Sequence, residues 1–183
     1  MTVHIVGVGV VKGHLTGRAR ALLRMADVIY GSKRALRLAG VDGVEMTRFT
    51  PEVYARIQQE GEHMNVVVLS TGDPMVAGLG TKLSGVVEPG ISCVQLALAR
   101  LRVDLAEVVV VDAHGKSAYE EIEKALSLRD VLVLADSRFD VQRLGDREVV
   151  LLENLGLEDE RVVEARARDV DIRSDLVMLL IRR

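Results

Sequence analysis

Short apolar runs rich in Val and Ile alternate with amphipathic segments along the first half of the chain. The run Val3–Val8 is almost wholly apolar and β-branched, which predicts a buried strand. The same reasoning predicts strands at Asp27–Tyr30, Val44–Thr47, Asn65–Ser70 and Val86–Glu88. Helices are predicted at Leu15–Ala26, Ser32–Ala39, Thr50–Gly61 and Ser92–Leu101. A further helix, interrupted by glycines, is predicted from the Gly72–Pro74 loop to about Ser84. This alternation predicts a mainly parallel, doubly wound sheet.

Capping residues support several of these helix boundaries. Ser32 is the expected N-cap and Gly40 the expected stop of the second helix. Thr50 is the expected N-cap of the third helix, with Pro51 in its first turn.

The second half has fewer helical segments, and its strands follow one another closely. Strands are expected at Glu107–Asp112, Val131–Ala135, Glu148–Glu153, Arg161–Ala167 and Leu176–Ile181, and helices at Ser117–Leu126 and near Arg138–Leu144. Such a pattern favours a mixed sheet. We therefore predict an α/β protein of two lobes, 1–103 and 104–183, with the boundary at Leu101–Asp104 and a ligand-binding cleft between them.

Composition narrows the class of protein. Aromatic residues make up only 3% of the 183 residues and the net charge is −3, which argues against a nucleic-acid partner. The single cysteine, Cys93, excludes an internal disulfide and favours a reducing cytoplasm. The histidines are scattered without zinc-ligand spacing, and there is neither a signal peptide nor an apolar run of the ~20 residues that span a membrane. These features predict a soluble cytoplasmic protein that uses no metal.

Charge is distributed unevenly along the chain. Residues 12–37 contain seven Lys and Arg and one acid, whereas residues 104–183 contain twelve Lys and Arg and nineteen acids. The asymmetry suggests that the first half meets an anion. A solvated helix face is the alternative.

The first glycine loop follows the first predicted strand, as Gly7-Val8-Gly9. Glycines at this place let the backbone turn tightly and approach a ligand. The dinucleotide-binding fingerprint has a third glycine where this chain has Lys12, and the second strand ends in Tyr30-Gly31-Ser32 without the ribose-binding acid. A nicotinamide or flavin site is therefore disfavoured, and a simple tight turn remains the alternative.

Two further loops at strand ends contain candidate cofactor-binding residues. Asp73, in Ser70–Pro74, could accept hydrogen bonds from ribose hydroxyls or an amine, with an Asx-type turn or helix cap as the alternative. The turn at Pro89-Gly90 precedes Ser92, an expected helix cap, and Cys93, for which a small buried thiol is favoured over a nucleophile.

The loop after the strand Glu107–Asp112 reads Ala113-His114-Gly115-Lys116. His114 could move a proton near neutral pH, and Lys116 could bind a carboxylate. A loop histidine without a role is the alternative.

In this order and spacing, the segments resemble the tetrapyrrole methylase family over nearly the whole chain. The GxG after the first strand, the Gly-Asp-Pro loop after the fourth and the Pro-Gly-Ile-Ser turn carry the resemblance. The segments Ala26–Leu36, Ile91–Ala97 and His114–Lys116 are similar to the cobalt-precorrin-7 C5-methyltransferase branch of that family. One departure is that Val10 and Val11 replace the usual Pro-Gly of the first loop, and Lys12 stands near the place of an acid, so no acid–base role is carried over to this loop.

The resemblance implies a two-lobed homodimer that binds S-adenosylmethionine between the lobes and a precorrin tetrapyrrole at the mouth. Cofactor contacts would come from Gly9, Val10, Gly72, Asp73, Pro74, Val76, Ser92, Cys93, Ala135 and Asp136. Substrate contacts would come from Lys12, His14, Lys33, Arg34 and Lys116, and His114 would be the base.

The implied reaction is methyl transfer to ring carbon C5 of a cobalamin precursor. A separate protein would then methylate C15 and decarboxylate, because no second methyltransferase domain is expected in this chain. The alternatives are methylation of another tetrapyrrole position, of a protein side chain or of an RNA ribose, and a nucleotide-binding module without turnover.

Overall fold

Two units make up the chain in the computed structural model, which describes residues 1–183: Met1–Cys93 and Val94–Arg183. The division therefore lies at the start of helix α4 (Cys93–Leu101), whereas the sequence suggested a boundary after this helix. None of the helices is both long enough and apolar enough to cross a membrane.

The first unit is built on a five-stranded sheet with the order β3-β2-β4-β1-β5. Its strands are β1 (Val3–Gly7), β2 (Val28–Gly31), β3 (Val44–Glu45), β4 (Val66–Ser70) and β5 (Val86–Glu88). Every neighbouring pair is parallel. The predicted parallel sheet is confirmed, and the carboxyl ends of its strands lie at one edge.

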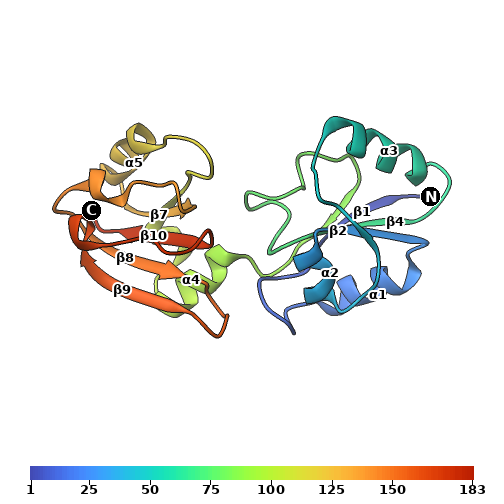
Figure 1. Ribbon diagram of the computed structural model, residues 1–183, viewed down its shortest axis with the longest axis horizontal. Helices are drawn as coiled ribbons and strands as arrows, with labels where there is room; N and C mark the ends of the chain where they lie inside the picture. Colours follow the sequence, from blue (N-terminus) through green and yellow to red (C-terminus); the bar gives the residue numbers. More distant parts are fainter. The chain divides into compact units, whose positions relative to one another are not determined.

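Helices cover both faces of this sheet, as Figure 1 shows. Helices α1 (Gly17–Met25) and α2 (Lys33–Ala39) pack on one face, against side chains such as Val6 and Leu69. Helix α3 (Pro51–Gly61) packs on the other face, against side chains such as Ile5. Because both faces are buried, the central strands β1 and β4 are apolar except for His4 and Ser70.

The expected caps of these helices are present except for one. The Ser32 hydroxyl accepts a hydrogen bond from the Ala35 N–H at 3.2 Å, and Gly40 ends α2 in the left-handed conformation. Thr50 occupies the N-cap position of α3, but the prediction that its side chain caps the helix is wrong. The Thr50 hydroxyl bonds the Glu52 carboxylate instead and lowers the pKa of that group.

The predicted helix from Pro74 to Ser84 is also wrong. Residues 71–85 form turns and bends, with turn bonds such as Gly80 N–H to the Pro74 carbonyl at 2.8 Å. Ala77 has a φ of 49°, in the left-handed region, which a right-handed helix does not tolerate. Gly78 and Gly80 weaken the helix further.

A mixed sheet with the order β6-β7-β10-β8-β9 forms the second unit, as predicted. Its strands are β6 (Val108–Asp112), β7 (Asp130–Ala135), β8 (Glu148–Glu153), β9 (Arg161–Arg166) and β10 (Val177–Ile181). Only β6 and β7 are parallel; the other pairs are antiparallel.

Helix α5 (Tyr119–Leu126) buries Ile122 against the core of this sheet. The helix predicted near Arg138–Leu144 is reduced to the 3₁₀ turn η2 (Val141–Leu144). The reason is that Asp136 accepts a hydrogen bond from the Arg138 N–H at 2.9 Å, which makes a local turn where the helix would begin. Two further 3₁₀ turns are η1 (Leu105–Glu107) and η3 (Ala167–Asp169).

Candidate active site

Three glycine-containing loops meet at the carboxyl ends of β1, β4 and β5. Gly9 and Gly72 form an isolated antiparallel bridge, with N–H to carbonyl distances of 3.1 and 2.9 Å. A Cβ on Gly90 would lie 2.4 Å from the Gly72 carbonyl oxygen and 2.9 Å from the Gly7 Cα. Only glycine permits this approach of three backbones.

Asp73 ties two of these loops together. Its Oδ1 accepts from the Met75 N–H at 2.7 Å, and its Oδ2 accepts from the Gly90 N–H at 3.0 Å. The first bond is the Asx-type turn that the sequence left open as an alternative. Because each carboxylate oxygen has a second acceptor site, the same oxygens remain able to accept a hydrogen bond from a ligand.

The cofactor residues predicted in the first unit gather around Gly72. From the position of a Cβ on Gly72, which has a φ of 72°, the Val10 Cγ1 and the Ser92 Cα are each 3.8 Å away. The Val76 N–H bonds the Asp73 carbonyl at 3.1 Å and so belongs to the same loop. The structure therefore brings these predicted residues together, along with Gly9, Pro74 and Cys93 as their neighbours in sequence.

The predicted substrate residues of the first unit separate into two kinds. Lys12 and Lys33 are exposed. Arg34 is partly buried, donates to the Val10 carbonyl oxygen at 3.4 Å and interacts electrostatically with Cys93. His14 packs so tightly on the first loop that a Cβ on Gly9 would lie 2.1 Å from the His14 Cβ.

The cations of the first unit have no acidic partners. Every ion pair in the structure joins residues of the second unit, and none involves a Lys or Arg of Met1–Cys93. Burial lowers the pKa of the Arg34 guanidinium, and neighbouring Arg37 lowers it further. A partly buried cation without a counter-ion suits an anionic ligand, as the uneven charge of the sequence suggested.

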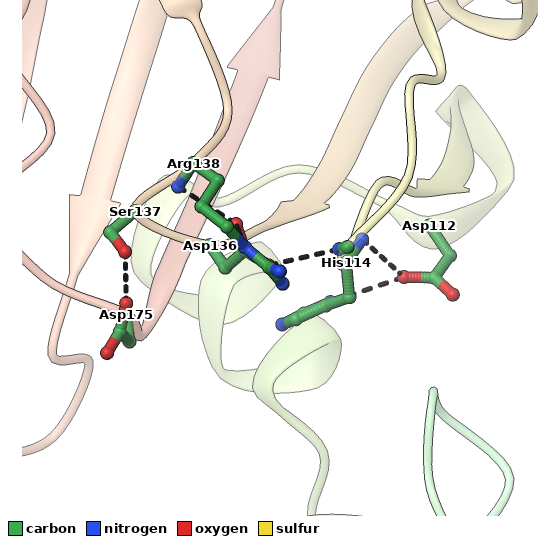
Figure 2. A network of polar contacts seen from close by, with 7 residues as sticks. Asp112, His114, Asp136, Ser137, Arg138 and Asp175 are labelled. Carbon is green, nitrogen blue, oxygen red and sulfur yellow. Dashed lines mark hydrogen bonds and ion pairs between the residues drawn. The ribbon is translucent and has the colours of Figure 1, made fainter.

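In the second unit, Asp136 joins the loops that follow β6 and β7 (Figure 2). Its Oδ2 accepts from the Gly115 N–H at 3.0 Å and from Arg138 Nη2 at 2.6 Å. These hydrogen bonds, those of Arg138 above all, lower the pKa of Asp136 to about 2. The next residue, Ser137, donates to Asp175 ahead of β10.

His114 lies beside Asp112, the last residue of β6, as Figure 2 shows. The His114 Nδ1 is 3.2 Å from Asp112 Oδ1, which also accepts from the His114 N–H at 3.1 Å. The carboxylate favours the tautomer with the proton on Nδ1, which leaves Nε2 as the basic nitrogen. Both side chains are nearly half exposed, so Nε2 is within reach of a ligand.

A pocket of about 320 Å³ adjoins these two loops within the second unit. Lys116, Ser117, Asp136 and Arg138 contribute its polar wall. Tyr119 and Phe139 stack with ring centroids 5.2 Å apart and form an apolar wall. Lys116 makes only a long ion pair, 3.6 Å from Glu121.

Arg138 was not singled out from the sequence, and Gly7, Gly90 and Asp112 were named only as parts of their motifs, without a role of their own. Asp112 and His114 lie two residues apart at a strand end, and so do Asp136 and Arg138. This spacing is a local signal that could have indicated Asp112 and Arg138. The contact of Gly7 with Gly90 joins distant parts of the chain, and no local pattern indicates it.

Residues 2–171 match the model of a family described as Tetrapyrrole (Corrin/Porphyrin) Methylases. A crystal structure of a precorrin-6Y methylase of cobalamin biosynthesis from Archaeoglobus fulgidus is 44% identical, with a TM-score of 0.91, and covers 100% of this chain and 98% of that protein.

Two curated relatives extend the comparison. The cobalt-precorrin-7 C(5)-methyltransferase of Salmonella typhimurium is 28% identical over 96% of this chain and 97% of its own length. The decarboxylating precorrin-6Y C(5,15)-methyltransferase of Mycobacterium tuberculosis is 30% identical over 90% of this chain and 47% of its own length. The family resemblance and the fold expected from it are confirmed. The chain belongs to the tetrapyrrole methylase family and is an S-adenosylmethionine-dependent methyltransferase.

Proposed function

We propose that this methyltransferase transfers a methyl group from S-adenosylmethionine to C5 of cobalt-precorrin-7, a reduced tetrapyrrole. The relatives from Archaeoglobus fulgidus and Salmonella typhimurium, which match nearly the whole chain, support this substrate. The observation that carries the proposal is the convergence of the three glycine loops, with Asp73 tying two of them together. Ligands of parallel α/β sheets bind at this edge.

The residues of the first unit fit the cofactor. A side chain at Gly72 would only just reach Val10 and Ser92, since a Cβ there would lie 3.8 Å from each, so the glycine leaves an open surface of small residues for a nucleoside. Asp73 offers acceptor sites for hydroxyl or ammonium groups. In the second unit, Ala135 and Asp136 at the end of β7 are the proposed contacts.

When bound, S-adenosylmethionine supplies an electrophilic methyl group on its positively charged sulfur. The protein's contribution is to hold the acceptor carbon in line with this group and to exclude water. Such positioning can supply roughly 7–11 kcal/mol of the barrier. The rigid backbone contacts of Gly7, Gly72 and Gly90 suit this task, because they fix the loops without flexible side chains.

His114 is the proposed acceptor of the proton that the acceptor carbon must lose after methylation. Asp112 holds the Nδ1 side of the ring, so Nε2 faces away from the carboxylate and is the atom proposed to take the proton. Lys116, two residues away, and Arg34 in the first unit are proposed to meet acidic arms of the substrate.

Three proposals about assembly and setting accompany this reaction. We infer a homodimer and a cytoplasmic location, as the family resemblance implied. We also infer that a separate protein methylates C15, because the Salmonella typhimurium relative, matched over 97% of its own length, has only the C(5) position in its name. Size-exclusion chromatography with light scattering tests the dimer.

The reaction is tested with purified protein, cobalt-precorrin-7 and S-adenosylmethionine that carries an isotope-labelled methyl group. Mass spectrometry should show a product heavier by one labelled methyl group, and carbon NMR should place it at C5. In the same assay, Arg34→Ala should raise the KM for the tetrapyrrole about tenfold or more, because a hydrogen bond to a charged group is lost. Arg24→Ala, an exposed arginine in the last turn of α1, is the matched control and should leave KM within about twofold.

Two outcomes would contradict the proposal. Label at another ring carbon would disprove the C5 position. Tight binding of S-adenosylhomocysteine without any label transfer to the tetrapyrrole would disprove the substrate.

A further inference from the structure

A second pocket, of about 310 Å³, lies wholly within the first unit. It is bounded by the ends of β2 and β4, by α3 and by the turn segment that follows Asp73. Phe49, Leu69 and Leu79 form its apolar wall. The proposed contacts of the cofactor do not include any of these residues, so the pocket has no part in the site described above.

The polar groups of this pocket are hydroxyls and one cation. Ser70, Thr71 and Tyr54 bring hydroxyl groups, and Lys82 brings an ammonium group. Burial raises the pKa of Tyr54, so its hydroxyl stays protonated and able to donate. No Asp or Glu lines the pocket, and no carboxylate forms an ion pair with Lys82.

The pocket shares its structural frame with the Asp73 loop. Ser70 and Thr71, on its wall, directly precede Gly72 and Asp73. On the other wall, a Cβ on Gly78 would lie 2.8 Å from Ser70 Oγ and 2.9 Å from the Asp73 carbonyl oxygen. A ligand that reaches the Asp73 loop therefore passes close to this pocket.

We propose that this pocket binds a carboxylate-bearing arm of the tetrapyrrole substrate, with Lys82 as the counter-ion; the inference rests on the proposed function. The apolar wall receives the methylene groups of the arm and the edge of its pyrrole ring. The carboxylate meets the Lys82 ammonium and the hydroxyls of Tyr54 and Thr71. Whole-ligand pockets span about 300–1,000 Å³, so a pocket at the lower limit suits one edge of a large macrocycle.

Charge variants at Lys82 test this assignment. Lys82→Ala should raise the KM for the tetrapyrrole about three- to tenfold, and Lys82→Glu should raise it further, with little change in kcat. Lys82→Arg should restore most of the affinity, because it keeps the charge. High salt should reduce the difference between wild type and Lys82→Ala, which a purely structural role would not produce.

The matched controls are Lys124→Ala and Lys124→Glu, at an exposed lysine of α5 that forms no ion pair. These variants should leave the KM within about twofold of wild type. Tyr54→Phe, which keeps the ring and removes the hydroxyl, should weaken substrate binding to a smaller extent than Lys82→Ala. The Kd for S-adenosylhomocysteine, measured by calorimetry, should be unchanged in all of them.

A binding assay without turnover separates this inference from the proposed function. Uroporphyrin, which carries acetate and propionate arms, should quench or shift its fluorescence on binding wild type and bind Lys82→Glu more weakly. Its methyl ester should bind both proteins equally weakly. If wild type methylates cobalt-precorrin-7 but its KM is unaffected in Lys82→Glu, the inference about the pocket is wrong and the function stands.

Other results would overturn the pocket inference in different ways. Equal loss of S-adenosylhomocysteine affinity in Lys82→Glu would show that the pocket serves the cofactor. Absence of any difference between uroporphyrin and its ester would show that carboxylates are not what it binds. If wild type fails to methylate but binds uroporphyrin in a Lys82-dependent way, the proposed reaction fails and the carboxylate subsite stands.

Discussion

Glycine at three positions determines how closely the loops at the sheet edge approach one another. Gly7 ends β1, and Gly72 and Gly90 follow β4 and β5. A Cβ on Gly7 or Gly90 would meet backbone atoms of the neighbouring loops within 3 Å, and Gly72 has a φ of 72°. A contact between side chains can adjust by a change of rotamer. A contact between two backbones cannot adjust in this way, so the loops themselves must move. The shape of the proposed cofactor site therefore depends on the absence of side chains.

Gly90→Ala should consequently weaken cofactor binding. The new methyl group would lie 2.4 Å from the Gly72 carbonyl oxygen, so the loops must separate. We expect a loss of about 1–3 kcal/mol in the free energy of unfolding and at least a tenfold weaker Kd for S-adenosylhomocysteine. Calorimetric titration and chemical denaturation measure the two quantities.

Gly17→Ala is the matched control for this substitution. Gly17 is the first residue of α1, and a Cβ there would meet nothing within 4 Å. Its replacement should leave binding intact and change stability by less than about 1 kcal/mol, in the stabilising direction. Unchanged binding in Gly90→Ala would show that the loop contact is not needed for the cofactor.

Asp73 illustrates how far a sequence can predict a single residue. Its position after β4, in a Gly-Asp-Pro loop, indicated a functional carboxylate, and the bond to the Met75 N–H is a local pattern that the same loop allows. Its bond to Gly90 spans seventeen positions and follows only from the parallel pairing that places the ends of β4 and β5 at one edge. Local patterns therefore identified the residue but not its second partner.

At the scale of elements, the strands were predicted more accurately than the connections. Central strands such as β4 and β10 are buried at every position and are apolar except for Ser70, so their composition alone identifies them. The segment after Pro74 has a helix-like pattern, but the left-handed Ala77 and two nearby glycines turn it instead. That conformation depends on the Asp73 loop beneath it, which the pattern does not contain.

Asp136 connects elements of the second unit, and its ionisation should make the stability of the fold depend on pH. Its pKa falls from 3.8 to about 2 in the folded chain, so the stabilisation is complete above about pH 4 and is lost as the pH falls towards 2. Asp136→Asn should lower the Tm by roughly 2–4 °C near neutral pH. The difference from wild type should shrink between about pH 4 and pH 2, as thermal unfolding followed by circular dichroism would show.

Asp171→Asn provides the comparison for Asp136→Asn. The Asp171 side chain is exposed and forms no ion pair, so this variant should follow wild type at every pH. A gap between wild type and Asp136→Asn that stays constant down to the lowest pH would contradict the role assigned to the Asp136 carboxylate.

At the scale of the whole molecule, the two units differ in how their charges are balanced. The second unit pairs many of its cations with acids, as in the buried Glu153 with Arg161 at 2.6 Å. The Lys and Arg side chains of the first unit form no ion pair with an acid, and this unit carries both the glycine loops and the Lys82 pocket. The anionic substrate proposed for this chain would supply the counter-ions that the first unit lacks.

Binding of S-adenosylhomocysteine should stabilise the whole chain. A ligand at a hundred times its Kd stabilises the folded state by about 2.7 kcal/mol, which corresponds to a rise in Tm of roughly 5–10 °C for a chain of this size. Differential scanning fluorimetry measures the shift. NAD⁺ is the control ligand, because the first loop lacks the dinucleotide fingerprint, and an equal shift with NAD⁺ would argue against the proposed site.

The edge strands of the first sheet have a consequence for how this protein avoids aggregation. β3 and β5, at the two edges, consist of only Val44–Glu45 and Val86–Glu88. A longer edge strand presents a row of unpaired N–H and C=O groups to which another chain can add a strand. Here both edges are too short to offer such a template, so the addition of a strand from another chain to the first sheet is disfavoured.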